Sequence, residues 1–457
     1  MKKQISIALA AAMLACSLFC GCRSDETDHK NDINHDNIKY ENTYIDGQDY
    51  QFQFYNNPAF SKINQAENGY YFISNNYFYY IDGKTMKTTP LCSKPNCLHD
   101  KEDDADEKQN CNAYADTSIP DAYQQLVCYG NNIYYIRKYT DEDDEQTYSE
   151  IVRVSSDGSS RETLFRFDNS NPLIPPVTHR GYLYYPISTY TVTDKKDENG
   201  NTILDYDTKI YRFDLSKNKP DPEVLIENDE FGSDGNIIIN EVNAYGNYLI
   251  ISYSDFSEYI DSQGNRHSIG NSEQIISVNI QDKKIVRLSD VELPEKDTRI
   301  SNIRFAGGKI LFNLKNADSK LTNGIYTMNF DGTDIKKVIT KTDEFRNALL
   351  SSDENYIYLS IHSDDKQIIQ IYDQDFKLIN TASLPAKDSG SGFQPGSGDK
   401  IICWGYEDLG AETTAEGFFS YGNHIRYYVN YVEKSELLKN NAELEWKNAF
   451  SLTTGED

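Results

Sequence analysis

Residues 69–83 read GYYFISNNYFYYIDG, and this stretch decides the fold. It holds two short runs of aromatic and aliphatic residues, separated by a polar Ser-Asn-Asn segment and closed by Asp-Gly. Short runs of this kind bounded by turn residues are typical of β-strands joined in a hairpin. The stretch therefore predicts two consecutive antiparallel strands.

The same pair of runs recurs along the chain. Six further copies of the first run begin at Asn132, Gly181, Asn247, Gly308, Asn355 and Asp399. Second runs follow them, beginning at Ile151, Ile210, Ile275, Ile325, Ile369 and Tyr427. From Gly69 onward the spacings between first runs are 63, 49, 66, 61, 47 and 44 residues. These values lie slightly above the roughly 40 to 50 residues of a four-stranded propeller blade.

A repeat of this size cannot bury its own faces. Small sheets stacked radially cover one another and leave only short edges. The body also lacks a sustained i, i+3, i+4 apolar pattern, so the predicted class is all-β. We predict a seven-bladed β-propeller, with six or eight blades as the alternative counts. Two β-sandwich domains are the other architecture, but they would not carry a near-regular unit to the C-terminus.

The repeat also predicts which face of the propeller carries the longest connections. If the two runs are the second and third strands of each blade, the second blade has its first strand near 125–128 and its fourth near 162–167. Connections from second to third strand, and from one blade to the next, then emerge on one face. The longest second-to-third connections are residues 138–148, 186–208, 252–273 and 405–426. We call this the elaborated face.

Composition limits the partners. The chain has 457 residues, of which 38% are hydrophobic and 12% aromatic, as expected of a folded globular protein. Its 72 acidic and 45 basic residues give a formal net charge of -27. Such a charge repels both a phosphate backbone and an anionic lipid surface. Nucleic acid is therefore excluded as an expected partner.

The chain begins like an exported protein. Lys2 and Lys3 precede an apolar run over residues 5–19, and acidic and polar residues follow from Asp25. This is the pattern of an export signal. The run is shorter than the roughly 20 residues that a helix needs to cross a bilayer. We therefore predict a cleaved signal and not a permanent membrane span.

Residues 18–22 read LFCGC and resemble the lipobox of bacterial lipoproteins, in which a small residue precedes an acylated cysteine. The resemblance implies that residues 1–21 are a lipoprotein signal peptide and that Cys22 is the lipidated N-terminus. Phe19 stands where the pattern usually has Leu. Cys16 is the other acceptor, and a plain secretory signal is the alternative. We expect residues 22–45 to form a flexible polar tether and residues 46–457 to form the propeller.

Four candidate metal ligands lie close together in the sequence. They are Cys92, Cys97, His99 and Cys111, with the spacing C-x4-C-x-H-x11-C. Three thiolates and one imidazole can complete a tetrahedral shell around a structural zinc ion. A disulfide between Cys97 and Cys111 is the alternative, because an exported protein meets an oxidising environment. Unlinked thiols are the third reading.

The count and the place of the cysteines bear on this choice. Five cysteines follow Cys22, at positions 92, 97, 111, 128 and 403, so they cannot all form intramolecular disulfides. The cluster lies in the connection from the first blade to the second and therefore on the elaborated face. Either a closed zinc shell or a disulfide would act there as a structural clasp.

The Cys/His segment lies between a Tyr-Tyr-Ile-Asp strand at 79–82 and Asn-Ala-Tyr at 112–114. In this arrangement it resembles a large group of bacterial surface lipoproteins with propeller domains of unknown function, related to the YWTD-type and Tol-associated propellers. The resemblance covers the signal, the Cys/His segment and most of the repeats. It implies a body outside the cytoplasm, lipid-anchored to the outer face of the bacterial cytoplasmic membrane. It implies no activity.

The sequence contains no G-x-S-x-G elbow, H-E-x-x-H pair, P-loop or G-x-G-x-x-G motif. Two functions from different classes remain. The first is a non-catalytic module whose elaborated face binds a protein, peptide or glycan outside the cell. The second is a hydrolase or lyase acting on an extracellular glycan through carboxylates over the central channel. The missing motifs favour the first, whereas two converging buried carboxylates at the channel mouth would support the second.

Overall fold

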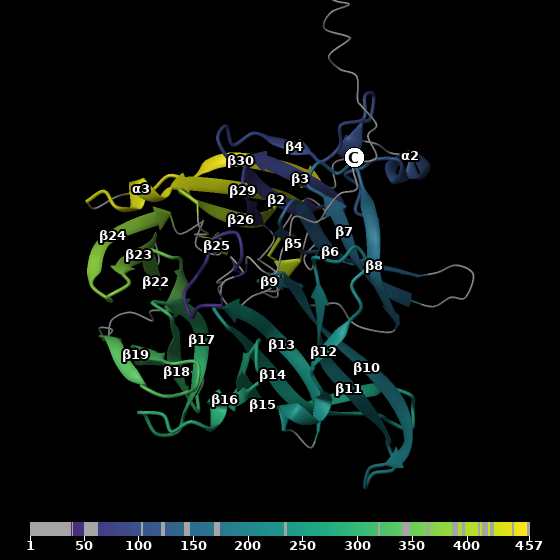
Figure 1. Cartoon of the computed structure of the whole chain (residues 1–457), viewed down its shortest axis with the longest axis vertical. Helices are drawn as coiled ribbons and strands as arrows, with labels where there is room; N and C mark the ends of the chain where they lie inside the picture. Colours follow the sequence, from purple (N-terminus) through teal and green to yellow (C-terminus); the bar gives the residue numbers. More distant parts are fainter. Residues whose placement is uncertain are drawn as a thin grey trace, which may run out of the picture. The chain divides into compact units, whose positions relative to one another are not determined.

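The computed structural model describes most of the chain from residue 38 to residue 454 (Figure 1). The exceptions within that range are residues 39, 50–62, 102–103, 120–123, 141–146, 169–173, 233–234, 319, 341–347, 363–365, 386–391, 395–397, 410–411, 414–418, 421–424 and 441–442. The predicted signal peptide, Cys16 and Cys22 lie outside the described residues. Their roles stay predictions.

Nearly all described elements are β-strands, and five of the sheets consist of four antiparallel strands in chain order. The first two are β1 (Asn64–Ala66), β2 (Gly69–Ser74), β3 (Tyr77–Asp82), β4 (Thr88–Pro90), and β5 (Leu126–Tyr129), β6 (Asn132–Thr140), β7 (Thr147–Ser155), β8 (Arg161–Asp168). The next two are β17 (Thr298–Ala306), β18 (Lys309–Asn316), β19 (Leu321–Met328), β20 (Lys336–Thr340), and β21 (Ala348–Ser352), β22 (Tyr356–His362), β23 (Lys366–Asp373), β24 (Leu378–Pro385). The last is β25 (Gly392–Gln394), β26 (Lys400–Asp408), β29 (Ile425–Glu433), β30 (Lys447–Thr454).

A larger sheet joins two such units. It contains β9 (Val177–His179), β10 (Tyr182–Lys196), β11 (Thr202–Asp214), β12 (Glu223–Ile226), β13 (Asn236–Tyr245), β14 (Tyr248–Ile260), β15 (Arg266–Asn279) and β16 (Ile285–Arg287). Strands β9 to β12 and β13 to β16 are each a four-stranded meander. Strand β11 additionally pairs with β14, from Thr202 opposite Ile260 to Leu204 opposite Glu258. This pairing fuses the two meanders at their long hairpins.

The remaining elements are short. They are the small hairpin β27 (Glu412–Thr413) and β28 (Phe419–Ser420), the helices α2 (Ala105–Gln109) and α3 (Lys434–Leu437), and the 3-10 turns η3 (His99–Lys101), η5 (Asn228–Phe231) and η6 (Leu288–Asp290). No helix within the described part of the chain has the length and apolar character needed to cross a bilayer.

The recurring sequence runs fall on the strands that they predict. Each first run lies on the second strand of a meander, from β2 to β26, and pairs antiparallel with the strand that carries the second run. In the second meander the expected first and fourth strands correspond to β5 and β8. The all-β, propeller-like class is therefore confirmed.

The first strands of consecutive meanders contact one another. The Asn64 side chain of β1 donates to the Leu126 carbonyl of β5 and accepts the Cys128 amide. The Thr178 hydroxyl of β9 donates to the Cys128 carbonyl at 3.3 Å. His179 Nε2 donates to the Gly246 carbonyl at 2.7 Å, beside β13. Tyr245 of β13 stacks on Phe305 of β17, and the Ser352 hydroxyl of β21 donates to the Phe305 carbonyl. Strand β21 in turn contacts β25. The Gly398 amide then donates to Gln65 Oε1 of β1 at 3.0 Å, so the last meander returns to the first.

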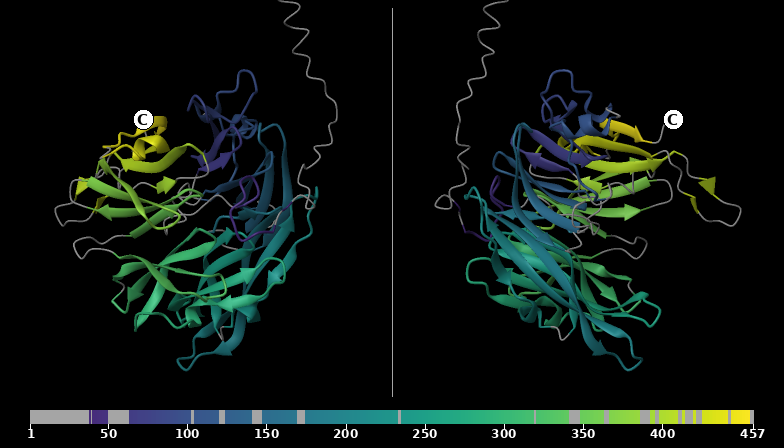
Figure 2. Two further views of the ribbon diagram at one scale, coloured as in Figure 1. Left: turned by 60° about the vertical axis from the view of Figure 1, so that its left-hand side comes forward. Right: turned by 90° about the vertical axis from the view of Figure 1, so that its right-hand side faces the viewer.

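Alternating strand direction gives these meanders two ends. Turns from the first to the second strand, and from the third to the fourth, emerge on one face, which we call the turn face. The opposite face is the elaborated face, where β10, β11, β14 and β15 run on for 13 to 15 residues each. The β10–β11 hairpin extends away from the other sheets in both views of Figure 2.

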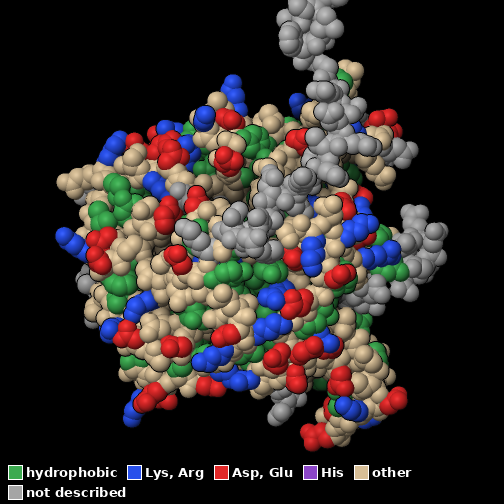
Figure 3. Space-filling view, viewed as in Figure 1, with side chains coloured by type: hydrophobic (Ala, Val, Ile, Leu, Met, Phe, Trp, Pro, Cys, Tyr) green, Lys and Arg blue, Asp and Glu red, His purple; other side chains and the backbone are tan. Residues whose placement is uncertain are grey.

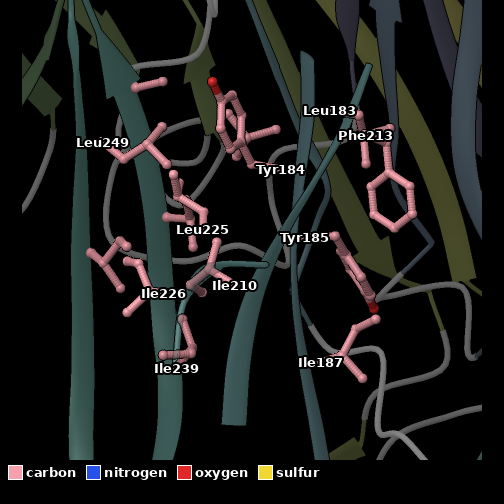
Figure 4. Packing of buried hydrophobic residues seen from close by; sticks show 14 of the residues in the cluster. Leu183, Tyr184, Tyr185, Ile187, Ile210, Phe213, Leu225, Ile226, Ile239 and Leu249 are labelled. Carbon is pink, nitrogen blue, oxygen red and sulfur yellow. The ribbon is translucent and has the colours of Figure 1, made fainter. Parts of the chain in front are cut away.

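Aromatic and aliphatic side chains pack between the meanders. In the largest cluster, Tyr184 of β10 and Ile210 of β11 are fully buried on the side of Ile239 and Leu249 of the fourth meander (Figure 4). Phe213 of β11 lies on the other side, against Phe165 of the second meander. Burying one such side chain contributes about 1.5 to 3 kcal/mol. Tyrosine therefore serves mainly as packing in these strands.

Candidate metal centre

The connection between β4 and β5 carries the four predicted ligands, and backbone hydrogen bonds fix it to the first meander. The Phe78 amide donates to the Ala113 carbonyl at 2.7 Å, and the Leu91 amide donates to the Phe78 carbonyl at 2.9 Å. The Ala115 amide donates to the Asn76 carbonyl at 2.7 Å. The segment thus lies beside the start of β3, at the elaborated face.

The same connection reaches the second meander. The Tyr135 hydroxyl of β6 donates to the Ala115 carbonyl at 2.8 Å. The Arg161 guanidinium of β8 donates to the Asn112 carbonyl at 3.2 Å and lies over the rings of Phe78 and Tyr135. The segment that holds the Cys/His cluster therefore ties the first two meanders together.

The structure brings all four predicted ligands to one place. The donor atoms of Cys92, Cys97, His99 and Cys111 lie within 4.8 Å of one another. His99 Nδ1 is 3.7 Å from Cys111 Sγ. Donors around a zinc ion, bound at about 2.0 to 2.3 Å, are roughly 3.3 to 3.8 Å apart. The four groups could therefore hold a metal ion after a contraction of up to about 1 Å.

Local backbone geometry makes this arrangement possible. Asn96 and His99 adopt positive φ angles of 65° and 56°. Such left-handed residues reverse the chain direction sharply. The reversals let Cys92, which precedes the Asn96 turn, face Cys97, His99 and Cys111, which follow it.

The thiols differ in how readily they ionise. Burial opposes ionisation of Cys92, but backbone N–H groups of Lys94 and Asn112 and the neighbouring thiols outweigh it, so its pKa is lowered. Cys111 is only 4% exposed, and burial together with the neighbouring Cys97 and Cys92 raises its pKa to about 12. A cation placed among these sulfurs would displace their protons, because the thiolate is the form that binds metal.

Cys92, Cys97 and Cys111 are free thiols in the structure, as are Cys128 of β5 and Cys403 of β26. The predicted Cys97–Cys111 disulfide stays a prediction, like the zinc ion. With four N and S donors present, a bound metal would have no open position for water or substrate. The arrangement therefore suits a structural clasp and not a catalytic centre.

The buried carboxylates were the other candidates for chemistry. Asp49, Glu150, Glu258 and Asp353 are the least exposed acidic residues among those described. Their respective cationic partners, at salt-bridge distance, are Arg180, Arg137, Arg266 and Lys434. Glu241 of β13 is partly exposed, and burial raises the pKa of its carboxyl. Two carboxylates that share a site without such partners are the usual source of an acid and base pair. These four instead have the surroundings of structural ion pairs.

Two features escaped sequence reasoning. Asp49 and Arg180 form a fully buried ion pair, although 131 residues separate them. The pairing of β11 with β14 is the other. Both hairpin tips share an Asp-x-x-Gly-Asn turn, at 197–201 and 261–265, but this motif specifies each turn and not the pairing of the two hairpins.

Comparisons with family models and with curated proteins find no match for this sequence. Among solved structures, a prolyl endopeptidase is similar at 11% identity and a TM-score of 0.42, over 82% of this chain and 55% of that one. TolB from Acinetobacter baumannii is similar at 13% identity and a TM-score of 0.30, over 72% and 61%. An oligogalacturonate lyase in complex with manganese is similar at 8% identity and a TM-score of 0.38, over 72% and 76%.

This chain thus spans about half the length of the prolyl endopeptidase and three fifths of that of TolB. The strand pairing and the contacts between meanders establish the propeller-like fold independently of these similarities.

Proposed function

We propose that the chain is a lipid-anchored, extracytoplasmic, seven-bladed propeller that binds an extended cationic polypeptide on its elaborated face. The blade count is supported by the meanders that start at β1, β5, β9, β13, β17, β21 and β25. Contacts between their first strands run in chain order, and the Gly398 to Gln65 hydrogen bond returns to the beginning. Each meander is one blade.

The anchor is Cys22, acylated after removal of residues 1–21. A protein with a net charge of -27 is repelled by anionic headgroups, so membrane attachment needs an inserted chain and not surface charge. The lipobox-like residues supply the acceptor, and residues 23–37 carry almost no apolar side chains that would hold them on the body. The body then lies on the outer face of the cytoplasmic membrane.

One observation carries the binding function: the outer edge of β15. Residues Arg266–Gly270 are all exposed, and within the described chain no strand pairs with their outer side, because β16 pairs only with Ile276–Val278. An exposed strand edge offers backbone N–H and C=O groups that an extended peptide can pair with. Ile269, 58% exposed, lies on the same strand face as His267, which stacks on Tyr259 with ring centroids 5.0 Å apart.

The edge is rigid. At the hairpin tip, Asp261 Oδ1 accepts the amides of Gln263 and Asn265 at 2.8 Å each, and Asp261 Oδ2 is paired with His267. On the neighbouring strand β14, the Glu258 carboxylate accepts hydrogen bonds from the guanidinium of Arg266. A peptide added to this edge would therefore meet a preformed template.

The other free edge of the fused sheet, along β10, is less suited to pairing. It contains Pro186, which has no N–H, and it ends in Lys195 and Lys196. Proline and edge lysines are the usual means by which proteins discourage strand addition. The β15 edge has neither between Arg266 and Glu273. We therefore assign the docking site to β15.

Charge selects the kind of peptide. Residues 188–208 carry five acidic and two basic side chains, and residues 252–274 carry four acidic and one basic, a balance of -6 over the two hairpins. Acidic side chains gather where β10 and β11 end at the lower right of Figure 3. A cationic partner gains from this field, and its binding weakens as salt is added.

A peptide library displayed against the full mature chain tests the proposal. We expect enrichment of extended, basic sequences whose binding falls at least tenfold in the Ile269→Lys variant. The control is Ile379→Lys on the distant edge strand β24, where the isoleucine is 45% exposed. Equal loss in both variants, or ligands that bind Ile269→Lys undiminished, would overturn the β15 assignment.

The Cys/His cluster serves this binder as a structural zinc clasp. It joins the first two blades at the face that carries the hairpins, and its four donors suit zinc. The competing reading is a Cys97–Cys111 disulfide, which would hold the same connection. Zinc content and sensitivity to a chelator separate the two, as described below.

A further inference from the structure

Residues Tyr40–Asp49 precede the first strand and lie against the turn face. The Arg180 amide, in the turn from β9 to β10, donates to the Gln48 carbonyl at 2.6 Å. An Arg180 side-chain N–H donates to the Glu41 carbonyl at 2.7 Å. The backbone of Asn42 lies against Gly246 and Gly308, in the turns that begin β14 and β18, so closely that a Cβ on either glycine would meet it at 2.9 to 3.0 Å. One segment therefore touches the turns of three consecutive meanders.

A buried ion pair holds this segment in place. The side chains of Asp49 and Arg180 are both 0% exposed, with Arg180 Nε 2.7 Å from Asp49 Oδ1. Arg180 Nη1 donates to Asn247 Oδ1 at 2.6 Å, so the same guanidinium also links the third and fourth meanders. The segment closes on itself, because the Asp49 amide donates to the Ile45 carbonyl at 2.9 Å and Asp49 Oδ2 accepts the Ile45 amide at 3.1 Å.

Part of this segment was expected to be tether. The boundary at residue 45 stays a prediction, but Glu41, Asn42 and Thr43 contact the body through backbone groups. Backbone contacts do not depend on side-chain identity, so the polar residues 41–43 give no sequence signal of them. Seventeen residues separate Cys22 from Tyr40 in the sequence.

We infer that residues 41–49 are a strap that closes the turn face and sets how the anchored body is presented. The inference rests in part on the proposed Cys22 anchor. The strap begins on the turn face, and the proposed anchor Cys22 precedes Glu41 by 19 residues in the chain, so the proposal places this face toward the anchor. The β15 edge and the Cys/His clasp, on the opposite face, point away from the membrane toward partners.

The strap itself is tested without a membrane, by hydrogen exchange on the full chain. We expect slow exchange of the Arg180 and Asp49 amides. In an Asp49→Asn variant, residues 41–49 and 179–181 should lose protection while β22 and β23 keep theirs. Asn247→Ala, which removes one Arg180 partner only, serves as the milder variant if Asp49→Asn fails to fold. Fast exchange of residues 41–49 in the parent chain would overturn the strap.

Presentation is tested on the lipidated chain in vesicles. Two exposed glutamines flank β15, Gln263 at the elaborated face and Gln281 at the turn face, and 14 strand residues separate them by about 44 Å. An azide-bearing residue at either position can carry a donor dye without using the native thiols. With an acceptor on the lipid headgroups, we expect more efficient energy transfer from position 281 than from position 263.

Equal transfer, or more from position 263, would overturn the presentation. Loss of vesicle binding in the parent chain, with residues 41–49 still protected, would overturn the lipid anchor and leave the strap supported. A Gly-Ser insertion before Tyr40 should reduce the difference between the two positions, because it lengthens the tether without touching the strap.

Discussion

The turn face and the elaborated face of this protein differ in what they bury and what they leave exposed. On the turn face, short turns meet a segment that is held by one buried ion pair, between Asp49 and Arg180. On the elaborated face, hairpins run beyond the sheets and leave Ile269 and its strand edge exposed. Buried paired groups stabilise a fold, whereas an exposed strand edge with an apolar side chain is accessible to a partner. If β15 binds a peptide as we propose, stability and recognition are separated onto opposite faces.

The largest expected effect concerns the buried pair. Asp49→Ala should lower the free energy of unfolding by about 3 to 5 kcal/mol, because Arg180 is left buried without its counter-charge. Asp205→Ala is the matched control, since its ion pair with Lys195 is exposed, and it should cost less than about 1 kcal/mol. Denaturant unfolding of both variants measures the difference. Equal costs would remove the distinction between the faces.

The Cys/His clasp is the exception on the elaborated face, because it should contribute stability there. Cys97→Ser should lower the free energy of unfolding by about 2 to 5 kcal/mol, through loss of a cross-link or of a metal ligand. If zinc is bound, the parent chain carries about one ion, and a chelator lowers its melting temperature. If a disulfide forms instead, a reductant lowers that temperature and no metal is found.

Cys128→Ser is the control for the clasp, because it keeps all four candidate ligands and should leave the metal content unchanged. An unaltered melting temperature for Cys97→Ser, in a parent chain that neither reagent affects, would show that the cluster has no structural role.

The exposed edge should behave in the opposite way. Ile269→Lys should change the free energy of unfolding by no more than about 0.5 kcal/mol, because the side chain has few neighbours to lose. Peptide binding should nevertheless be lost, as proposed above. Thermal unfolding measured beside the binding assay separates the two quantities. A strongly destabilised Ile269→Lys chain would mean that the edge supports the fold itself.

The smallest expected effect concerns two partly exposed aspartates on opposite faces, Asp334 and Asp261. On the turn face, hydrogen bonds from Lys309 and Lys336 lower the pKa of Asp334 to about 2. On the elaborated face, the hydrogen bond with His267 and backbone amides lower the pKa of Asp261. A carboxyl whose folded pKa lies below its unfolded value of 3.8 stabilises the fold above that value and loses this contribution as the pH falls through the folded pKa.

As the pH is lowered from 5 to 2, the free energy of unfolding should therefore fall less steeply in Asp334→Asn and in Asp261→Asn than in the parent chain. Added salt should weaken the Asp334 contribution, because the charges of its two lysine partners are screened. A difference between Asp334→Asn and the parent chain that does not change with salt would contradict this account.

Much of the fold was predictable because its signals are local. A run such as Tyr70–Ile73 contains residues that favour a pleated, half-buried strand, and each strand pairs with the next one along the chain. The candidate metal centre was predictable for the same reason, since its four ligands fall within 20 residues, from Cys92 to Cys111. In both cases the residues that interact in the fold are close together in the sequence.

The strap and the fused hairpins were not predictable in this way. Asp49 meets Arg180 only after the third meander has formed, and neither residue belongs to a motif. Strands β11 and β14 pair because two long hairpins of neighbouring meanders extend side by side. Nothing in either hairpin alone encodes the other as its partner.

By itself, therefore, the sequence determined the all-β class, the recurring strand pairs and the grouping of Cys92, Cys97, His99 and Cys111. These depend on residue preferences and on neighbours along the chain. The tertiary structure was needed to show that residues 41–49 lie on the turn face and that the β15 edge of the fused sheet stays open. Both depend on segments that are distant in the sequence and meet only after the sheets have packed. Arg180 can be buried only with Asp49 as its partner, and β11 and β14 cover each other's edges.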